Sequence, residues 1–327
     1  MNSGSQSDLK LQNQCVESFS KVRESMHQRI VGMDRVIDAL FWTLLGRGHA
    51  LFIGVPGLAK TLLISTLSEL VGLKFNRIQF TPDMMPSDLI GSEILEEDKS
   101  TGRRSFQFRK GPIFCQLLLA DEINRTPPKT QSALLQAMQE NRVSYAGQNY
   151  DFDLPFAVFA TQNPIESEGT YPLPEAQLDR FLFSIPIHYP SKEDEMDIVR
   201  RTNLGFDKPL EAVLSAAELL SYQDLVRRVP IEETLISLVV EIVRKTRPGE
   251  SMPESLREQI RFGAGPRASQ ALALGAKARA LLSGRFAVRE EDVISVAPYV
   301  LEHRVVLRRL RQKDASSVIE SLLSAGV

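Results

Sequence analysis

The sequence contains few of the residues that form covalent cross-links or metal sites. Its 327 residues include 2 cysteines and 4 histidines. Cys15 and Cys115 are far apart, and neither has a second cysteine nearby at the spacing of metal ligands. We therefore expect reduced thiols, with neither a disulfide framework nor a structural zinc site.

The sequence also has almost no net charge. Lysine and arginine number 39 against 41 for aspartate and glutamate, which leaves a formal charge of -2 at pH 7. This balance provides no overall electrostatic attraction toward nucleic acid or an anionic membrane. No nucleic-acid partner is therefore expected.

Long hydrophobic runs are absent as well. No run reaches the ~18 apolar residues of a membrane-spanning helix, and residues 1–8 lack the basic and apolar regions of a signal peptide. These absences predict a cytoplasmic protein without membrane insertion. The chain is nevertheless 43% hydrophobic, which is enough for a sizeable core. Its length of 327 residues exceeds the roughly 250–300 residues at which a single core stops growing, so two domains are expected.

A short apolar run at residues 51–53 leads into a glycine-bearing turn and then into Lys60 and Thr61. This order is typical of a phosphate-binding loop, where backbone N–H groups surround the phosphates, the lysine reaches the β and γ oxygens, and the hydroxyl ligates Mg²⁺. Ala59 replaces the usual second glycine, which is acceptable if its φ is negative. The alternative is an ordinary strand-to-helix turn. The residues expected to contact the nucleotide in this stretch are Gly54, Val55, Pro56, Gly57, Leu58, Ala59, Lys60, Thr61 and Leu62.

Two adjacent carboxylates follow the apolar residues 117–120. These apolar residues predict a parallel strand buried on both faces, and α/β sheets bind ligands at the carboxyl ends of such strands. We expect Asp121 to hold Mg²⁺ through water and Glu122 to act as a general base toward the attacking water. An apolar run ending in Asp-Glu is common, and it becomes informative here because a phosphate loop precedes it.

Three further polar residues are candidates for a nucleotide site. Asn163 follows a predicted strand at 156–161 and could orient the lytic water or contact the γ-phosphate, although an Asn-Pro turn explains it equally well. Arg180, on a short helix predicted within 173–182, is either a surface charge or a side chain that enters a neighbouring subunit's site. Arg267 is expected in the first turn of a helix, where the helix dipole disfavours a cation unless an anion such as phosphate compensates.

The order of elements predicts an α/β fold. Apolar residues at helical spacing over 9–28 indicate an amphipathic surface helix in an N-terminal segment, 1–28. The nucleotide-binding core is expected over 29–190. Beyond it the pattern is helical only, which predicts an all-helical domain over 191–327.

Two β-hairpins are expected within the core, because apolar and polar residues alternate on both sides of turn-forming residues. They cover about residues 91–109 and 142–152. A solvated loop is the alternative for the first of them.

These residues resemble, closely and in order, the MoxR family of AAA+ ATPases over about residues 29–269. The stretches that carry the resemblance are 54–61, 117–131, 160–164 and 177–181. The resemblance implies a three-layer α/β/α core with a parallel sheet, followed by an all-helical lid, with ATP and Mg²⁺ as cofactors. It also implies that both hairpins face a partner or a central pore.

The resemblance assigns roles to individual residues. Ile30 and Val31 become adenine-side contacts, although a plain corner between two helices is the alternative there. Arg267 is expected to contact the γ-phosphate, either within its own subunit or across an interface. The implied roles are Walker A for Lys60 and Thr61, Walker B for Asp121 and Glu122, sensor 1 for Asn163, arginine finger in trans for Arg180, and sensor 2 for Arg267.

The family implies a homo-hexameric ring that couples ATP turnover to the remodelling or activation of other proteins. Its partners often contain a von Willebrand factor A domain, and metal-cofactor insertion is sometimes the outcome. The sequence contains no such domain, so a separate client protein is expected. Two alternatives stay open: a nucleotide-gated scaffold with negligible turnover, and a DNA-stimulated AAA+ motor, which the near-neutral charge disfavours.

Overall fold

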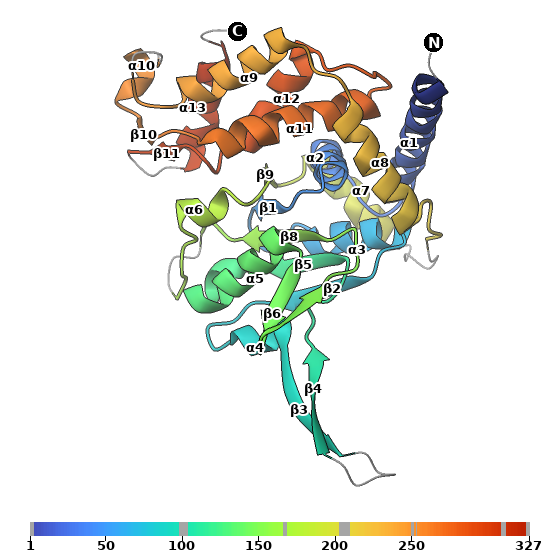
Figure 1. Ribbon diagram of the computed structural model, residues 1–327. Helices are drawn as coiled ribbons and strands as arrows, with labels where there is room; N and C mark the ends of the chain where they lie inside the picture. The colour runs from blue at the N-terminus through green and yellow to red at the C-terminus, as the bar shows by residue number, and fades with distance from the viewer. Residues whose placement is uncertain are drawn as a thin grey trace.

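At the centre of the protein is a parallel sheet of five strands covered by helices (Figure 1). Across the sheet the strands are β2 (Phe75–Gln79), β5 (Leu117–Asp121), β8 (Ala157–Gln162), β1 (Ala50–Ile53) and β9 (Phe183–Pro186). The residues described by this computed structural model are 3–97, 104–165, 169–202, 210–249, 252, 254–308 and 312–324. The predicted parallel sheet is confirmed.

Alternate side chains of the strands enter hydrophobic clusters on opposite faces of the sheet. In β5, Leu117 and Leu119 pack with α2 (Asp34–Leu45) and α3 (Lys60–Leu70) on one face, whereas Leu118 packs with α4 (Pro86–Ile90) and α5 (Pro128–Glu140) on the other. This alternation is what a strand covered on both faces requires. The helices of the core are α2 (Asp34–Leu45), α3 (Lys60–Leu70), α4 (Pro86–Ile90), the 3-10 helix η1 (Ile123–Arg125), α5 (Pro128–Glu140) and α6 (Glu175–Leu178). The three-layer α/β/α core is therefore confirmed.

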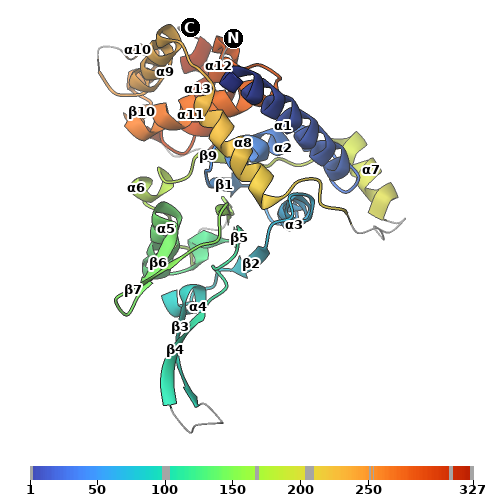
Figure 2. The ribbon, with the colours of Figure 1, turned by 45° about the vertical axis from the view of Figure 1, so that its right-hand side comes forward.

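Two antiparallel hairpins form at the segments where hairpins were expected, and the first projects from the body (Figures 1 and 2). Their strands are β3 (Gly91–Glu97), β4 (Arg104–Lys110), β6 (Arg142–Tyr145) and β7 (Gln148–Asp151). The turn of the first hairpin, 98–103, lies outside the described residues. Phe108 of β4 stacks on Tyr150 of β7 with ring centroids 4.1 Å apart, so the two hairpins contact each other through aromatic rings.

The N-terminal helix α1 (Ser3–His27) contacts α3 and the lid helices α8 (Ala216–Arg228) and α11 (Pro266–Leu282) (Figure 2). The side chains on its inner face, each at most 2% exposed, are Cys15, Phe19, Val22 and Met26. Their spacing of three or four residues places them on one side of a helix. The predicted amphipathic helix thus forms, and its apolar face is part of the core.

The C-terminal part of the chain is a helical lid, as expected. Its helices are α8 (Ala216–Arg228), α9 (Glu233–Lys245), α10 (Glu254–Arg257), α11 (Pro266–Leu282), α12 (Glu290–Leu301) and α13 (Gln312–Ser324). The lid also contains a short antiparallel pair of strands, β10 (Ile260–Phe262) and β11 (Val306–Leu307), which the all-helical prediction did not include. Strands of 3 and 2 residues are too short to show an alternating pattern in the sequence.

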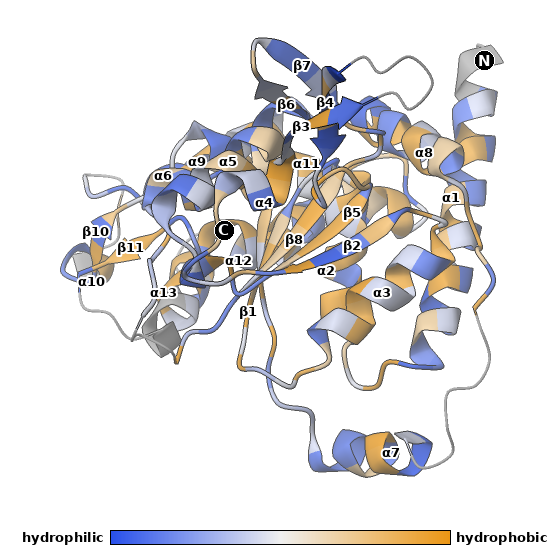
Figure 3. Cartoon of the chain, turned by 90° about the horizontal axis from the view of Figure 1, so that it is seen from below, coloured by the Kyte–Doolittle hydropathy of each residue, from blue (hydrophilic) through white to orange (hydrophobic). Residues whose placement is uncertain are grey.

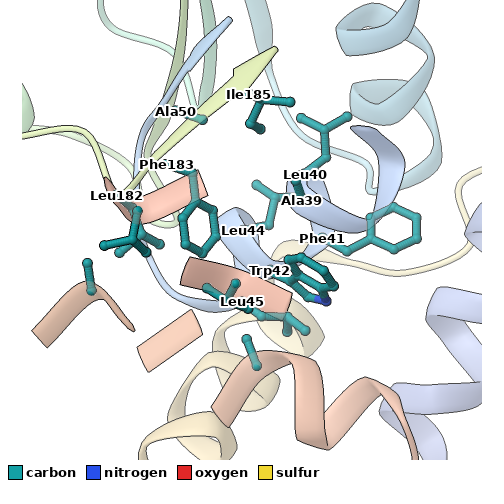
Figure 4. Packing of buried hydrophobic residues seen from close by; sticks show 14 of the residues in the cluster. Ala39, Leu40, Phe41, Trp42, Leu44, Leu45, Ala50, Leu182, Phe183 and Ile185 are labelled. Carbon is teal, nitrogen blue, oxygen red and sulfur yellow. The ribbon is translucent and has the colours of Figure 1, made fainter. Parts of the chain in front are cut away.

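The lid and the sheet share one hydrophobic cluster, in which α2 lies between them (Figure 4). Trp42 of α2 packs edge-on against Tyr299 of α12, with centroids 5.9 Å apart. A Cβ at Gly275 of α11 would lie 2.7 Å from Cζ of Phe183 in β9, so glycine permits this close approach. Among the described residues, the buried core is therefore continuous across the expected domain boundary near residue 190.

Helix α7 (Lys192–Thr202) lies apart from the other lid helices (Figure 3). Its Arg201 donates a hydrogen bond to the carbonyl oxygen of His27 at 2.6 Å. A Cβ at Gly32, where φ is +70°, would lie 2.6 Å from the carboxyl group of Asp194. Although its sequence falls in the expected lid domain, α7 packs beside the turn that follows α1.

Candidate functional site

A pocket of ≈ 520 Å³ lies where β1, β5 and β8 end. The residues that line it are Pro56, Gly57, Leu58, Ala59, Lys60, Thr61, Leu62, Arg77, Gln79, Asp121, Glu122 and Asn163. All of these except Arg77 and Gln79 were predicted from the sequence. The predicted site residues that do not line it are Ile30, Val31, Gly54, Val55, Arg180 and Arg267; Ile30 is only 3% exposed.

The Lys60 ammonium group is held by its own loop. Nζ donates hydrogen bonds to the carbonyl oxygens of Gly54 at 2.7 Å and Val55 at 3.2 Å. Burial lowers the pKa of Lys60, while the nearby carboxylates of Asp121 and Glu122 act in the opposite direction. An anion in the pocket would likewise favour the charged lysine.

The loop ends in a backbone conformation that the sequence did not predict. The condition under which an alanine would be acceptable at position 59, a negative φ, is not met: the φ of Ala59 is +50°, and the residue caps the N-terminus of α3. A left-handed conformation costs an alanine about 1–2 kcal/mol. Among the described residues, no side chain caps α3. The N–H groups of its first turn therefore face the pocket, an arrangement that suits phosphate.

The carboxylate of Asp121 is held on both of its oxygens. Arg77 Nη2 donates to Oδ2 at 2.7 Å, and the Thr161 hydroxyl donates to Oδ1 at 2.6 Å. Asp121 and the hydroxyl-bearing Thr61 line the same pocket and offer the hard oxygen atoms that Mg²⁺ prefers. The described residues contain no group of three histidine, cysteine or acidic side chains suited to a metal. These donors fit a magnesium ion that takes most of its other ligands from phosphate and water.

The carboxylate of Glu122 also has two donors. Gln79 Nε2 lies 2.9 Å and Arg125 Nε 2.8 Å from its Oε2. Gln79 is opposite Asp121 in the parallel register of β2 with β5, which brings Gln79 and Arg77 to these acids. The only signal in the sequence was the presence of polar residues at alternate positions of β2.

Asn163 both lines the pocket and forms a local turn, the two roles that its sequence allowed. Its side chain lines the pocket, and the residue is 6% exposed. Its Oδ1 accepts a hydrogen bond from the N–H of Ile165 at 3.1 Å, which is a local turn interaction. The side-chain amide nitrogen is therefore the group with which Asn163 can act as a donor in the pocket.

The two predicted arginines lie together in a different place. Arg180 and Arg267 line a second pocket of ≈ 220 Å³ and not the loop pocket. Arg180 was expected on a short helix, but α6 ends at Leu178, so it lies in the turn that follows. Its Nε is buried and has no hydrogen-bond partner among the described residues. Arg267 is in the first turn of α11, as predicted, with its side chain 51% exposed.

Family models match the two parts of the chain that contain these groups. Residues 49–183 match the ATPase family associated with various cellular activities (AAA), and residues 254–322 match the AAA lid domain. Chaperone MoxR1 of Mycobacterium tuberculosis is 46% identical over 280 residues, which are 85% of this chain and 73% of MoxR1. The chain belongs to the MoxR family of AAA+ ATPases.

Two further comparisons extend over nearly the whole chain. Protein MoxR of Methylorubrum extorquens is 30% identical over 331 residues, which are 94% of this chain and 93% of that protein. A solved structure from Cytophaga hutchinsonii superposes with a TM-score of 0.89 at 38% identity, and covers 99% of this chain and 98% of the other. The described part of this MoxR-family chain therefore has the fold of that solved protein.

The two family models together include the residues of both pockets. The AAA match contains the loop, the two acids, Asn163 and Arg180, while the lid match contains Arg267. None of the described helices combines the length and the apolar character that crossing a membrane requires.

Proposed function

We propose that this MoxR-family chain is a magnesium-dependent ATP hydrolase that works as a homo-hexameric ring. One observation carries the proposal: Lys60, Asp121 and Glu122 line a single pocket together with the N-terminus of α3. This combination offers a cation and N–H groups to phosphate, and carboxylates to a metal and to water.

Residues 54–62 hold the phosphates of ATP. Lys60 exchanges its bonds to the carbonyl oxygens of Gly54 and Val55 for bonds to phosphate oxygens. Thr61 and, through water, Asp121 would hold the magnesium ion, which would supply positive charge to the phosphates and the leaving group. Ile30 and Val31, in the turn before α2, contact the adenine side of the nucleotide.

Glu122 takes the proton from the attacking water, and Asn163 orients that water or the γ-phosphate. Gln79 Nε2 and Arg125 Nε lie 2.9 and 2.8 Å from Oε2 of Glu122 and hold this carboxylate in the pocket. General-base catalysis of this kind contributes about 10²–10⁴-fold to a rate.

Arg180 and Arg267 act on the nucleotide of a neighbouring copy. The support for this role is that both line a pocket separate from their own phosphate loop. Arginine fingers supplied in trans contribute about 10³–10⁵-fold to turnover. A single subunit therefore has only part of a catalytic site, and the isolated monomer is nearly inactive.

The ring uses ATP turnover to remodel or activate a separate client protein. A protein with a von Willebrand factor A domain is one candidate, and metal-cofactor insertion is one possible outcome. The support is the family, together with the first hairpin, which exposes Phe106 and Leu95 to solvent at 70% and 54%.

The test of the ATPase proposal is Glu122→Gln. We expect this variant to bind ATP normally and to lose about 10²–10⁴-fold in kcat, measured by phosphate release, while Glu140→Gln on the exposed end of α5 keeps the wild-type rate. Normal turnover by Glu122→Gln contradicts the role given to Glu122. Wild-type protein that binds ATP without turnover supports the scaffold alternative, and stimulation by DNA at physiological salt supports the motor alternative.

The same variant can identify the client. A ring of Glu122→Gln subunits stays in its ATP-bound state, so a client that binds this state remains attached during a pull-down. Lys60→Ala, which we expect not to bind ATP, is the matched control, and a client must be retained by the first variant and not by the second.

A further inference from the structure

We propose that Asp179 and Arg304 are positioning residues, which join the lid to the turn that carries Arg180 and thereby orient both Arg180 and Arg267 toward a neighbouring subunit. The inference rests on the proposed function, in which the two arginines act in trans. It adds a residue pair that touches no nucleotide and acts through these arginines.

Arg304 follows α12 in the lid, and its side chain is only 4% exposed. Its Nε donates to Oδ1 of Asp179 at 2.7 Å. Its two other nitrogens donate to main-chain carbonyl oxygens of the same turn, at 2.7 Å to Phe181, 3.2 Å to Leu182 and 3.3 Å to Asp179. One buried guanidinium group therefore binds the whole turn that contains Arg180.

The guanidinium group of Arg304 also forms a hydrogen bond within the lid. Its Nη1 donates to the carbonyl oxygen of Val300 in the last turn of α12 at 2.7 Å. Beside it, Nε2 of His303 lies 3.1 Å from the carbonyl oxygen of Phe181. The turn between α6 and β9 is thus attached to the end of α12 by two adjacent lid residues.

Asp179 connects this attachment to the second arginine. Its Oδ1 accepts from Arg304, while its Oδ2 lies 3.8 Å from Nη1 of Arg267 at the start of α11. Arg180 is the next residue along the chain and lines the same pocket as Asp179 and Arg267. The carboxylate of Asp179 therefore faces both Arg304, which is buried in the lid, and Arg267, which is one of the two proposed catalytic arginines.

The charges explain why this pair should orient the turn. Burial lowers the pKa of Arg304, and the carboxylate of Asp179 opposes that effect. Without Asp179, the buried guanidinium would lose its counter-charge, and the turn would settle in another position. A displacement of about 1 Å in a catalytic group can cost on the order of 10²-fold in rate.

The experiment uses Asp179→Asn and Arg304→Lys in the full chain, each alone and each mixed with Glu122→Gln. Alone, each should assemble rings and bind ATP with KM within about twofold of wild type, but with kcat lowered by about 10- to 100-fold. In the mixture, activity should recover several-fold above the sum of the separate proteins. The reason is that Glu122→Gln subunits keep intact arginines and can supply them to the intact pocket of the other variant.

Two controls make the outcomes distinct. Asp224→Asn removes another core-to-lid ion pair, in which Arg47 lies 2.6 Å from Asp224, and it should retain wild-type kcat. Arg180→Ala mixed with Glu122→Gln tests the trans assignment alone. If that mixture fails to recover, the proposed function is wrong and this inference falls with it.

If the Arg180→Ala mixture recovers and the Asp179→Asn and Arg304→Lys mixtures do not, the pair stabilises only its own subunit and the inference is overturned. Wild-type kcat in both variants overturns it as well. Should Asp179→Asn fail to assemble, Arg304→Lys, which keeps the positive charge, decides between these outcomes.

Discussion

The guanidinium of Arg77 lies 2.7 Å from the carboxylate of Asp121, across the register of β2 with β5. This interaction places a cation on the acid that we propose as a magnesium ligand. The Arg77 side chain is 46% exposed, so solvent screens the pair. Ion pairs of this kind contribute up to about 1 kcal/mol, which corresponds to about fivefold in an equilibrium constant.

Replacing Arg77 should therefore help magnesium to bind. We expect Arg77→Met to lower the Mg²⁺ concentration needed for half-maximal binding of a fluorescent ATP analogue by up to about fivefold. Arg104→Met, which removes the exposed pair with Glu97 in the first hairpin, should leave this concentration unchanged. A higher Mg²⁺ requirement in Arg77→Met would instead indicate that Arg77 binds the nucleotide.

The left-handed backbone at Ala59 predicts the effect of a glycine there. Glycine removes about 1–2 kcal/mol of backbone strain from the folded state. Against this, its greater conformational entropy stabilises the unfolded chain by about 0.4–1 kcal/mol. Ala59→Gly should therefore raise the free energy of unfolding by up to about 1.6 kcal/mol, measured by urea denaturation. Ala133→Gly within α5 should lower it by about 1 kcal/mol. If both variants lose stability equally, Ala59 does not have a positive φ in solution.

His49 predicts a loss of stability in acid. Its ring accepts a hydrogen bond from Val158 N–H at 3.0 Å and lies 3.1 Å from the carbonyl oxygen of Met138. Burial lowers the pKa of His49 to about 4, whereas the unfolded chain takes up this proton near pH ~6.5. Between these values the unfolded state binds more protons, so stability falls as the pH drops from about 6.5 to 4.

The size of this effect can be measured by substitution. We expect it to reach roughly 3 kcal/mol at pH 4. The free energy of unfolding should thus decrease less between pH 7 and pH 4 in His49→Gln than in the wild type. His188→Gln, at an exposed position, should follow the wild-type curve. Parallel curves for wild type and His49→Gln would contradict a buried neutral histidine.

The contact between the hairpins should stabilise the second of them. The ring of Phe108 lies 4.1 Å from that of Tyr150 and 5.1 Å from that of Tyr145, measured between centroids. Phe108→Ala removes contacts worth about 0.5–1.5 kcal/mol per aromatic pair. Amide hydrogen exchange in β6 and β7 should therefore become about 2- to 10-fold faster, since local opening becomes easier.

A neighbouring aromatic residue provides the control for this measurement. Phe106 is on the same strand and is 70% exposed. Phe106→Ala should leave exchange in β6 and β7 unchanged. Equal acceleration by both variants would attribute the effect to the first hairpin as a whole and not to the Phe108–Tyr150 contact.

Local sequence determined most of the elements and all of the residues that line the loop pocket except Arg77 and Gln79. The run before Asp121 and Glu122 predicted a strand buried on both faces, because such a strand needs apolar side chains at every position. Lys60 and Thr61 were predicted beside these acids, since parallel strands bring their carboxyl ends to one edge. In each case the signal lies within a few consecutive residues.

The remaining features depend on contacts between distant parts of the chain. Arg77 meets Asp121 only because β2 and β5 pair in one particular register. Arg304 reaches Asp179 only because α12 packs against β9 and brings residues 125 positions apart into contact. The positive φ of Ala59 likewise follows from how the loop joins β1 to α3. The periodicity of the sequence indicates which residues are buried. Which charged residues meet depends on strand register and on packing between elements, and only the tertiary structure decides these.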